Sequence, residues 1–273
     1  MLEVKRNGMT ESKEIIVKVV DVSKKFQNQP VLESINMDIP RGKLVAITGT
    51  SGCGKSTLLK IVAALNYPDN GKVYIENTDI FQLSRKKLFE FRKDFGFLFQ
   101  DAALISNLTI FDNIALPLRY HYNIPEDEIN NQVNSILDEF GLSHLKNYLP
   151  AQLSMGQRKL ISFVRALIMK PKILFLDEPV TGIDAIARQK MTEMILPLRD
   201  DPNITIIMVS HNLEFIKQSA DYIALLHENK LLAYDKRNEI IKSRDPIINR
   251  ILSIIIDEEA LIAEEVLDIL KGK

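Results

Sequence analysis

Hydrophobic and polar positions follow two patterns along the chain, one typical of strands and one typical of helices. β-Branched and continuously apolar runs bounded by turn residues predict strands over 15–20, 31–39, 44–48, 72–75, 95–100, 172–177 and 203–210. Two further apolar runs, 221–226 and 230–234, predict an edge hairpin. Apolar residues at helical spacing predict helices over 58–65, 110–116, 125–140, 158–167 and 185–199, and a short charged helix is expected over 85–92. Because the stretch from Leu104 to about Ile168 has helical texture throughout, the pattern indicates an α/β fold with a helical insert.

A glycine-rich loop joins the apolar strand at 44–48 to the helix at 58–65. It consists of Gly49, Thr50, Ser51, Gly52, Cys53, Gly54, Lys55, Ser56 and Thr57. Its glycines let successive backbone N–H groups turn towards a phosphate chain, and the helix adds its positive N-terminal end. Lys55 is expected to reach the β- and γ-phosphates and Ser56 to place its hydroxyl on Mg²⁺. The sequence therefore predicts a nucleotide-binding site.

Two carboxylates, Asp177 and Glu178, end an apolar run that is typical of a buried parallel strand. Asp177 is expected to hold Mg²⁺, and Glu178 to take a proton from an attacking water. The alternative is that Asp-Glu-Pro only opens a loop. Gln100 ends another strand and is a candidate to ligate Mg²⁺ or orient water, although a single Gln at such a place is usually a surface residue.

Four more residues are candidates by their place in the pattern. Ser154 and Gly156 precede a helix and form a second possible anion site at its N-terminus. Phe26 lies in a loop before the phosphate loop, where it can stack on adenine or simply fill the core. His211 directly follows the strand at 203–210.

Composition narrows the function classes. The 273 residues carry a net charge of −1, which argues against nucleic-acid binding because such proteins normally carry a basic excess. A single cysteine, Cys53, cannot form an internal disulfide, and the first residues lack the apolar core of a signal peptide, so the cytoplasm is expected. The longest apolar runs are far shorter than a membrane span, so any membrane role is expected to come through a partner.

From about Ile15 to Ile241 the chain resembles the nucleotide-binding subunit of ABC transporters. The motifs that carry this resemblance are GTSGCGKST as the Walker A loop, Gln100 as the Q-loop, LSMGQ as the signature, ILFLDEP as the Walker B strand, TGID as the D-loop and His211 as the switch histidine. Phe26 matches the aromatic residue that stacks on adenine, where the family more often has Tyr. One departure concerns the signature, since Met155 stands where the family has its first glycine.

The resemblance implies a fold, cofactors and roles. It implies an ABC-type P-loop NTPase with a mixed-sheet core, a helical subdomain and an N-terminal antiparallel β part. ATP and Mg²⁺ are the implied cofactors, with Glu178, His211 and Gln100 catalytic and Ser56, Gln100 and Asp177 at the metal. Ser154, Gly156 and Gln157 of the signature, with Asp184 of the D-loop, are implied to act on ATP bound by a second copy, so the chain is expected to form a homodimer.

Within the superfamily, the chain looks like the ATPase of the Mla or MCE-associated lipid transporters. The similarity runs through 98–104 and 109–118 and includes 245–252. It implies an integral membrane permease partner, an MCE-type lipid-binding partner and a peripheral place on the cytoplasmic face of the inner membrane. The alternatives are the lipoprotein-releasing and cell-division members. A soluble ABC protein of repair or translation would carry heptad inserts or two cassettes, and a metabolic P-loop kinase would not need LSMGQ or His211.

Three segments follow from this interpretation. They are an N-terminal extension at 1–14, a nucleotide-binding domain at 15–244 with its helical subdomain at about 104–168, and a C-terminal helical tail at 245–273. Within the tail, Asp257 to Lys273 has apolar residues at helical spacing and acidic residues elsewhere, which predicts an amphipathic helix that docks on protein. Its own ATPase core and a second copy are both possible docking partners.

Overall fold

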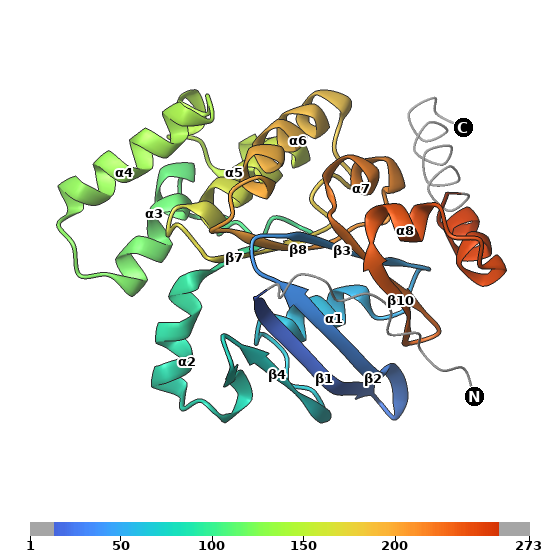
Figure 1. The fold of residues 1–273 in the computed structure, drawn as a ribbon. Coiled ribbons are helices and arrows are strands. Elements are labelled where there is room, and N and C mark those ends of the chain that lie inside the picture. The colour runs from blue at the N-terminus through green and yellow to red at the C-terminus, as the bar shows by residue number, and fades with distance from the viewer. Residues whose placement is uncertain (1–13, 257–273) are drawn as a thin grey trace.

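The protein was analysed as a computed structural model that describes residues 14–256. Two sheets and their helices form layers, with α1 between the sheets and α5, α6 and α7 on the far side of the larger sheet (Figure 1). The smaller sheet has the order β2-β1-β4-β5 and the larger one β10-β9-β3-β8-β7-β6. The strands are β1 (Ile15–Phe26), β2 (Gln29–Pro40), β3 (Leu44–Gly49), β4 (Asn70–Ile75), β5 (Thr78–Asp79), β6 (Phe95–Leu98), β7 (Ile173–Asp177), β8 (Thr205–Val209), β9 (Tyr222–His227) and β10 (Lys230–Lys236).

The pairing of strands separates the two sheets. Every pair in the smaller sheet is antiparallel, whereas β6, β7, β8, β3 and β9 run parallel and β10 joins the edge antiparallel to β9. The predicted mixed-sheet core, N-terminal antiparallel part and edge hairpin are therefore confirmed. Because parallel strands end on the same side, the carboxyl ends of β3, β7 and β8 meet along one edge of the sheet.

Helices cover the larger sheet on both faces. The helices of residues 14–256 are α1 (Lys55–Val62), α2 (Arg85–Phe91), α3 (Ile110–His121), α4 (Glu126–Glu139), α5 (Met155–Leu167), α6 (Ala185–Arg199), α7 (Leu213–Ser219) and α8 (Arg237–Ile241). In the same part of the chain, short 3-10 helices cover Ile80–Gln82, Arg92–Asp94, Ser143–Leu145 and Pro150–Gln152. The chain is also helical over 246–256. Within residues 14–256, no helix combines the length and the apolar character needed to cross a bilayer.

Strand β3 explains why the central runs of the sequence are continuously apolar. Leu44 and Ala46 belong to the core under α3 to α7, while Val45 and Ile47 belong to the core shared with α1 and the smaller sheet. The strands β7, β8 and β9 divide their side chains between the two cores in the same alternating way. A strand buried on both faces has no polar face, so it loses the period-two pattern of a half-buried strand. This burial fixes where the strand ends lie.

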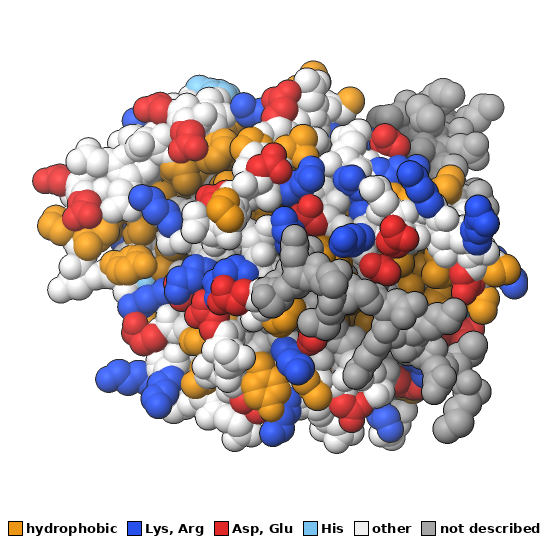
Figure 2. Space-filling model, in the orientation of Figure 1, with side chains coloured by type: hydrophobic (Ala, Val, Ile, Leu, Met, Phe, Trp, Pro, Cys, Tyr) orange, Lys and Arg blue, Asp and Glu red, His pale blue; other side chains and the backbone are white. Residues whose placement is uncertain are grey.

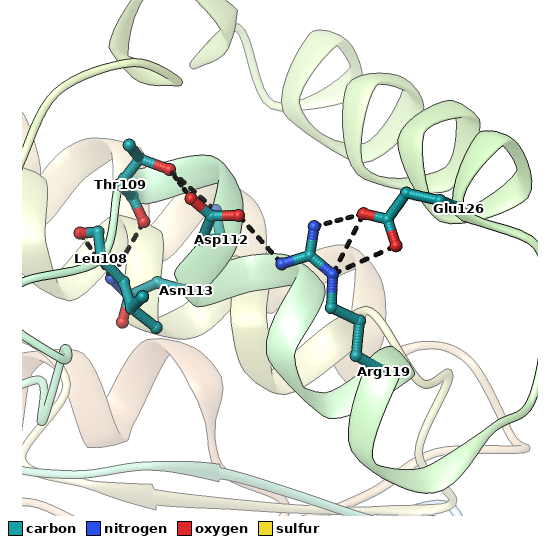
Figure 3. A network of polar contacts seen from close by, with 6 residues as sticks. All are labelled: Leu108, Thr109, Asp112, Asn113, Arg119 and Glu126. Carbon is teal, nitrogen blue, oxygen red and sulfur yellow. Dashed lines mark hydrogen bonds and ion pairs between the residues drawn. The ribbon is translucent and has the colours of Figure 1, made fainter.

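A polar network joins α3 to α4 (Figure 3). The hydroxyl of Thr109 caps α3 by accepting a bond from Asp112 N, and it donates to Asp112 Oδ2 at 2.5 Å. Arg119 bridges the helices by donating to Asp112 Oδ1 at 2.9 Å and to Glu126 at the start of α4. The buried amide of Asn113 binds the backbone of the preceding loop, accepting from Ile105 N at 2.8 Å and donating to Ile105 O at 3.1 Å. These bonds order the loop that follows the Q-loop.

Several expectations need adjustment. The structure has two helices, α7 and α8, that the periodicity did not indicate, since five to seven residues are too few to display a helical repeat. The helix expected from 158 begins at Met155, because the capping residue Ser154 lies further upstream. The expected amphipathic helix from Asp257 to Lys273 and most of the N-terminal extension lie outside the described residues.

Candidate nucleotide-binding site

The phosphate loop is a tight turn built on close backbone contacts. A Cβ on Gly49 would lie 2.0 Å from Leu226 O, and one on Gly54 would lie 2.5 Å from Val31 O. Gly54 also has φ 94° and immediately precedes α1, so only glycine fits there without strain. Lys55 is the first residue of α1, and its ammonium donates hydrogen bonds to Gly49 O at 2.9 Å and Thr50 O at 2.8 Å. The loop thus holds its own lysine at the N-terminal end of the helix, where an anion is favoured.

Cys53 lies within the loop but faces the core. Only 4% of its surface is exposed, and it belongs to the hydrophobic core cluster that also contains Leu32 and Leu58. Burial raises the pKa of its thiol, and the nearby charge of Lys55 opposes this shift. The thiol is therefore a packing group of the loop and mostly protonated at neutral pH.

Ser56 and Asp177 come together from different elements. Ser56 lies in the first turn of α1, and Asp177 is the last residue of β7. The Ser56 hydroxyl donates to Asp177 Oδ1 at 2.8 Å, and burial raises the pKa of this carboxyl while the bond from Ser56 opposes the shift. A hydroxyl beside a desolvated carboxylate is the set of hard oxygen donors that Mg²⁺ prefers, so these residues fit the metal.

Gln100 shares a cavity with Asp177. The cavity has a volume of about 650 Å³ and is lined on its other sides by Lys60, Met155 and Thr181. Gln100 is exposed and lies just beyond the end of β6. Gln100 and the Asp177 carboxyl therefore border the same space.

Glu178 is bound at every polar group. Its backbone has φ 50°, its N–H donates to Val209 O at 3.0 Å, and only 6% of the residue is exposed. Carboxylate Oε2 accepts the Thr181 hydroxyl at 2.8 Å, and Oε1 lies 3.0 Å from His211 Nδ1. The carboxylate is therefore fixed in direction, and Glu178 directly follows Asp177 of the Ser56–Asp177 pair. A fixed direction is what a general base requires.

Two cationic side chains on α5 hold the neighbouring loops. Lys159 donates to Glu178 O at 2.5 Å and Thr181 O at 2.7 Å, and burial lowers its pKa although the carboxylates of Glu178 and Asp177 oppose the shift. Arg165 donates to the carbonyls of Ala102 and Ala103, at 2.9 and 2.8 Å, just after Gln100. Sequence reasoning missed both residues, since a basic residue on a helix is usually solvated.

The signature residues form the start of α5. The Ser154 hydroxyl accepts Gln157 N at 3.2 Å, and the Gln157 side chain accepts Ser154 N at 3.0 Å, which is a complete capping box. Met155 is the first helical residue and has no positive φ, so glycine's conformational freedom is not needed at that position. A Cβ on Gly156 would lie 2.5 Å from Ala187 Cβ, which explains why this residue must be small.

Asp184 lies beside this glycine and caps the next helix. Its Oδ1 accepts Ala187 N at 2.9 Å at the start of α6, and its Oδ2 would be 3.4 Å from a Cβ on Gly156. The structure therefore brings the D-loop and the signature together. The described contacts of Ser154, Gly156 and Gln157 are made within α5 and with α6.

Phe26 ends β1 and is 48% exposed. The ammonium of Lys24 lies 5.5 Å from its ring centroid. Phe26 is therefore a surface residue whose ring can face a planar ligand, and the core interpretation of this residue is not supported.

A phosphate loop between a central parallel strand and a helix, an acidic pair at the end of β7 in the same sheet and a capped signature helix together define an ATP-binding cassette. Residues 32–181 match the ABC transporter family, and the chain belongs to this family. It is an ABC ATPase subunit.

Curated relatives cover most of the chain. The chain is 33% identical to the intermembrane phospholipid transport system ATP-binding protein MlaF of Haemophilus influenzae, over 84% of this chain and 87% of the relative. MlaF of Escherichia coli strain K12 is 31% identical over 91% and 93%. A probable ribonucleotide transport ATP-binding protein, mkl of Mycobacterium leprae, is 33% identical over 88% and 69%.

Solved structures share the fold. A dimeric structure of the ATP-binding cassette MJ0796 in a post-hydrolysis state with ADP and phosphate matches with a TM-score of 0.75 and 31% identity, over 81% of this chain and 98% of that one. The cbiO1 protein of Clostridium perfringens, part of an ABC transporter complex, matches with a TM-score of 0.74 and 28% identity over 90% and 100%. The ABC-type fold is therefore confirmed.

Proposed function

We propose that this chain hydrolyses ATP to ADP and phosphate to power phospholipid trafficking across the bacterial envelope. The observation that carries the proposal is the placement of Glu178, whose carboxylate is held by Thr181 and His211 next to the Ser56–Asp177 pair. A fixed base beside hard oxygen donors and a phosphate loop suits phosphoryl transfer to water.

Each residue has a role in this proposal. The backbone N–H groups of residues 49–57 and the Lys55 ammonium bind the phosphates, and Phe26 stacks on adenine. Ser56 and Asp177, with Gln100, hold Mg²⁺, which when bound neutralises phosphate charge. Glu178 accepts the proton of the attacking water, and His211 orients the Glu178 carboxylate and the γ-phosphate.

The proposal includes a second copy of the chain. Ser154, Gly156 and Gln157 would complete the ATP site of the partner copy, with Asp184 beside them. The dimeric state named for MJ0796 supports this arrangement. Ile186, which is 84% exposed in the first turn of α6 near Asp184, offers an apolar surface for the same contact.

A groove supports the proposed contact with a membrane permease. It has a volume of about 610 Å³, and its apolar and aromatic wall includes Phe97, Phe99, Ile105, Leu116, Tyr120 and Met169. Tyr120 is 70% exposed, and hydrophobic side chains gather over the region of α3 and α4 (Figure 2). Such a surface suits the apolar face of a helix. The permease would hold the chain at the cytoplasmic face of the inner membrane.

Phospholipid is the cargo that the MlaF relatives favour, since their names state it and they align over 84% and 91% of this chain. The name of the mycobacterial relative states ribonucleotide transport instead. An MCE-type lipid-binding subunit is a further proposed partner. The cargo is therefore the part of the proposal that an experiment must decide.

The test is to purify the full chain from detergent-extracted membranes of the organism that produces it. We expect an integral membrane protein to co-purify, and the complex to contain phospholipid when it is extracted and analysed by mass spectrometry. ATP addition should lower the bound lipid in the wild-type complex and not in a Glu178→Gln complex. A complex that binds ribonucleotide or lipoprotein in place of phospholipid would reject the lipid assignment, and a chain without ATPase activity would reject the proposal as a whole.

A further inference from the structure

Lys159 is buried between the signature helix and the acidic pair. It lies in the second turn of α5, five residues after Ser154, and only 1% of it is exposed. Its ammonium donates to the carbonyl oxygens of Glu178 and Thr181, at 2.5 and 2.7 Å. No role assigned above to nucleotide, metal or water uses this side chain.

The geometry of Glu178 explains what this contact can do. A non-glycine residue with φ 50° is strained by about 1–3 kcal/mol and persists only where its surroundings fix it. On one side, Glu178 N donates to Val209 O at 3.0 Å. On the other side, Lys159 holds the carbonyl of Glu178. The direction of the side chain depends on both anchors.

Thr181 binds both the ammonium of Lys159 and the carboxylate of Glu178. Lys159 holds its carbonyl, while its hydroxyl donates to Glu178 Oε2 at 2.8 Å. One ammonium therefore sets the backbone at both ends of the 178–181 turn. Burying a lysine is expensive and is uncommon unless its donors are used, so an apolar residue would be the simpler filling for this space.

We propose that Lys159 is a positioning residue that orients Glu178 for ATP hydrolysis and links this orientation to the signature helix. Ser154 caps α5 and Gly156 lies in its first turn, so a displacement of the first turns of α5 moves Lys159 and with it the 178–181 turn. The signature that serves one ATP site is thereby joined to the base of its own chain's site. This inference rests on the proposed hydrolysis at Glu178.

The test is Lys159→Met in the full-length protein, since Met preserves most of the chain length and packing but has no N–H donors. The control is Lys172→Met, because Lys172 precedes the other end of β7 and makes an exposed ion pair with Asp94 at 3.0 Å. Steady-state ATPase, affinity for a non-hydrolysable ATP analogue and thermal unfolding are measured for each variant.

We expect Lys159→Met to lower kcat about tenfold or more, because a misplaced reacting group costs rate steeply. KM and analogue affinity should stay within about threefold of wild type, since the phosphate loop is untouched. Lys172→Met should match wild type in all three. A merely structural lysine would lower stability without this split between kcat and KM.

A second variant covers the case in which Lys159→Met does not fold. Lys159→Arg retains donors but places them on a wider planar group, so kcat should fall about threefold with analogue affinity unchanged. Turnover equal to wild type in the folded variant, or kcat and affinity lost in proportion, would overturn the inference. Failure of wild-type ATPase itself would instead contradict the proposed function.

Discussion

At the scale of single residues, two groups of the site are held in place by hydrogen bonds to the surrounding fold. Glu178 is held through its N–H, its carbonyl and both carboxylate oxygens. Lys55 is held by two carbonyls of its own loop. Groups fixed before the ligand arrives need little reorganisation during reaction, which is the condition for strong electrostatic catalysis.

Glu178→Gln should bind ATP and fail to turn it over. The amide retains the shape and can still contact Thr181 and His211, but it cannot accept the proton of water, so kcat should fall about 100-fold or more. Phosphate release measures turnover, and dimers should accumulate with ATP. The control Glu193→Gln changes an exposed carboxylate on α6 and should be unaffected. Near-normal hydrolysis in Glu178→Gln would reject the assignment of Glu178 as the general base.

Lys55→Ala, by contrast, should lose ATP binding itself.

Alkylation of Cys53 should be slow and dependent on loop opening. The thiol is buried and its pKa is raised, so little of it is the reactive thiolate at neutral pH. Below that pKa, each unit by which the pH is raised increases the thiolate fraction about tenfold. A maleimide adduct should abolish ATPase because it cannot fit in the core beneath the loop, and Mg²⁺-ATP should protect by holding the loop closed. Mass spectrometry over time measures the rate. Fast labelling at neutral pH that leaves activity intact would contradict this view of the loop.

At the scale of elements, β6 and α5 approach so closely that only glycine fits between them. A Cβ on Gly96 would lie 2.3 Å from Ala166 O and 2.9 Å from Leu174 Cδ1. The backbone oxygen belongs to a helix and cannot move by itself. The contact therefore fixes the distance between α5 and the strand that leads to Gln100.

Gly96→Ala should lower the free energy of unfolding by about 1–3 kcal/mol, because the added methyl must push α5 away. Gly141→Ala is the comparison, since Gly141 has φ 66° and open space around its Cβ, so only backbone strain of about 1 kcal/mol applies. Urea denaturation of both variants measures the difference. A Gly96→Ala variant no less stable than Gly141→Ala would show that the two elements can separate freely.

Sequence reasoning succeeded where a signal is local. Strands such as β7 and helices such as α6, predicted over 185–199 and found at Ala185–Arg199, follow from apolar spacing and a capping Asp184. The sequence also predicted Ser56 and Asp177 at a common Mg²⁺ and Glu178 as a base, whereas the Ser56–Asp177 and Glu178–His211 contacts were found only in the structure. The burial of Lys159, the inward direction of Cys53 and the anchoring by Arg165 depend on tertiary packing, which one sequence does not reveal.

At the scale of the whole molecule, two exposed apolar regions face different proposed partners. Ile186 lies beside the D-loop, and Tyr120 lines the groove formed by residues of β6, α3 and α5. They belong to different elements and share no residue. The dimer and the permease complex should therefore be separable by mutation.

Ile186→Glu should weaken ATP-dependent dimers of the Glu178→Gln protein while the chain remains with the membrane complex. Tyr120→Glu should release the chain from the membrane complex while the ATP-dependent dimers remain. In both variants the new charge would be buried without a partner in the contact, which opposes association. Light scattering measures the dimer, and retention in detergent-extracted membranes measures the complex. Each variant serves as the control for the other. Loss of both associations in one variant would show that the two surfaces are coupled.

Helix α5 is anchored at three levels, by its capping box at Ser154, by Lys159 and by Arg165. A helix advances 1.5 Å and turns 100° with each residue, so these anchors point where they do only for one spacing between them. Adding or removing one residue between Lys159 and Arg165 would swing one anchor by about a quarter of a turn, and only one of the two loops could be reached. The number of residues in this helix is therefore itself a requirement of the site, one that substitution at any single position would not reveal.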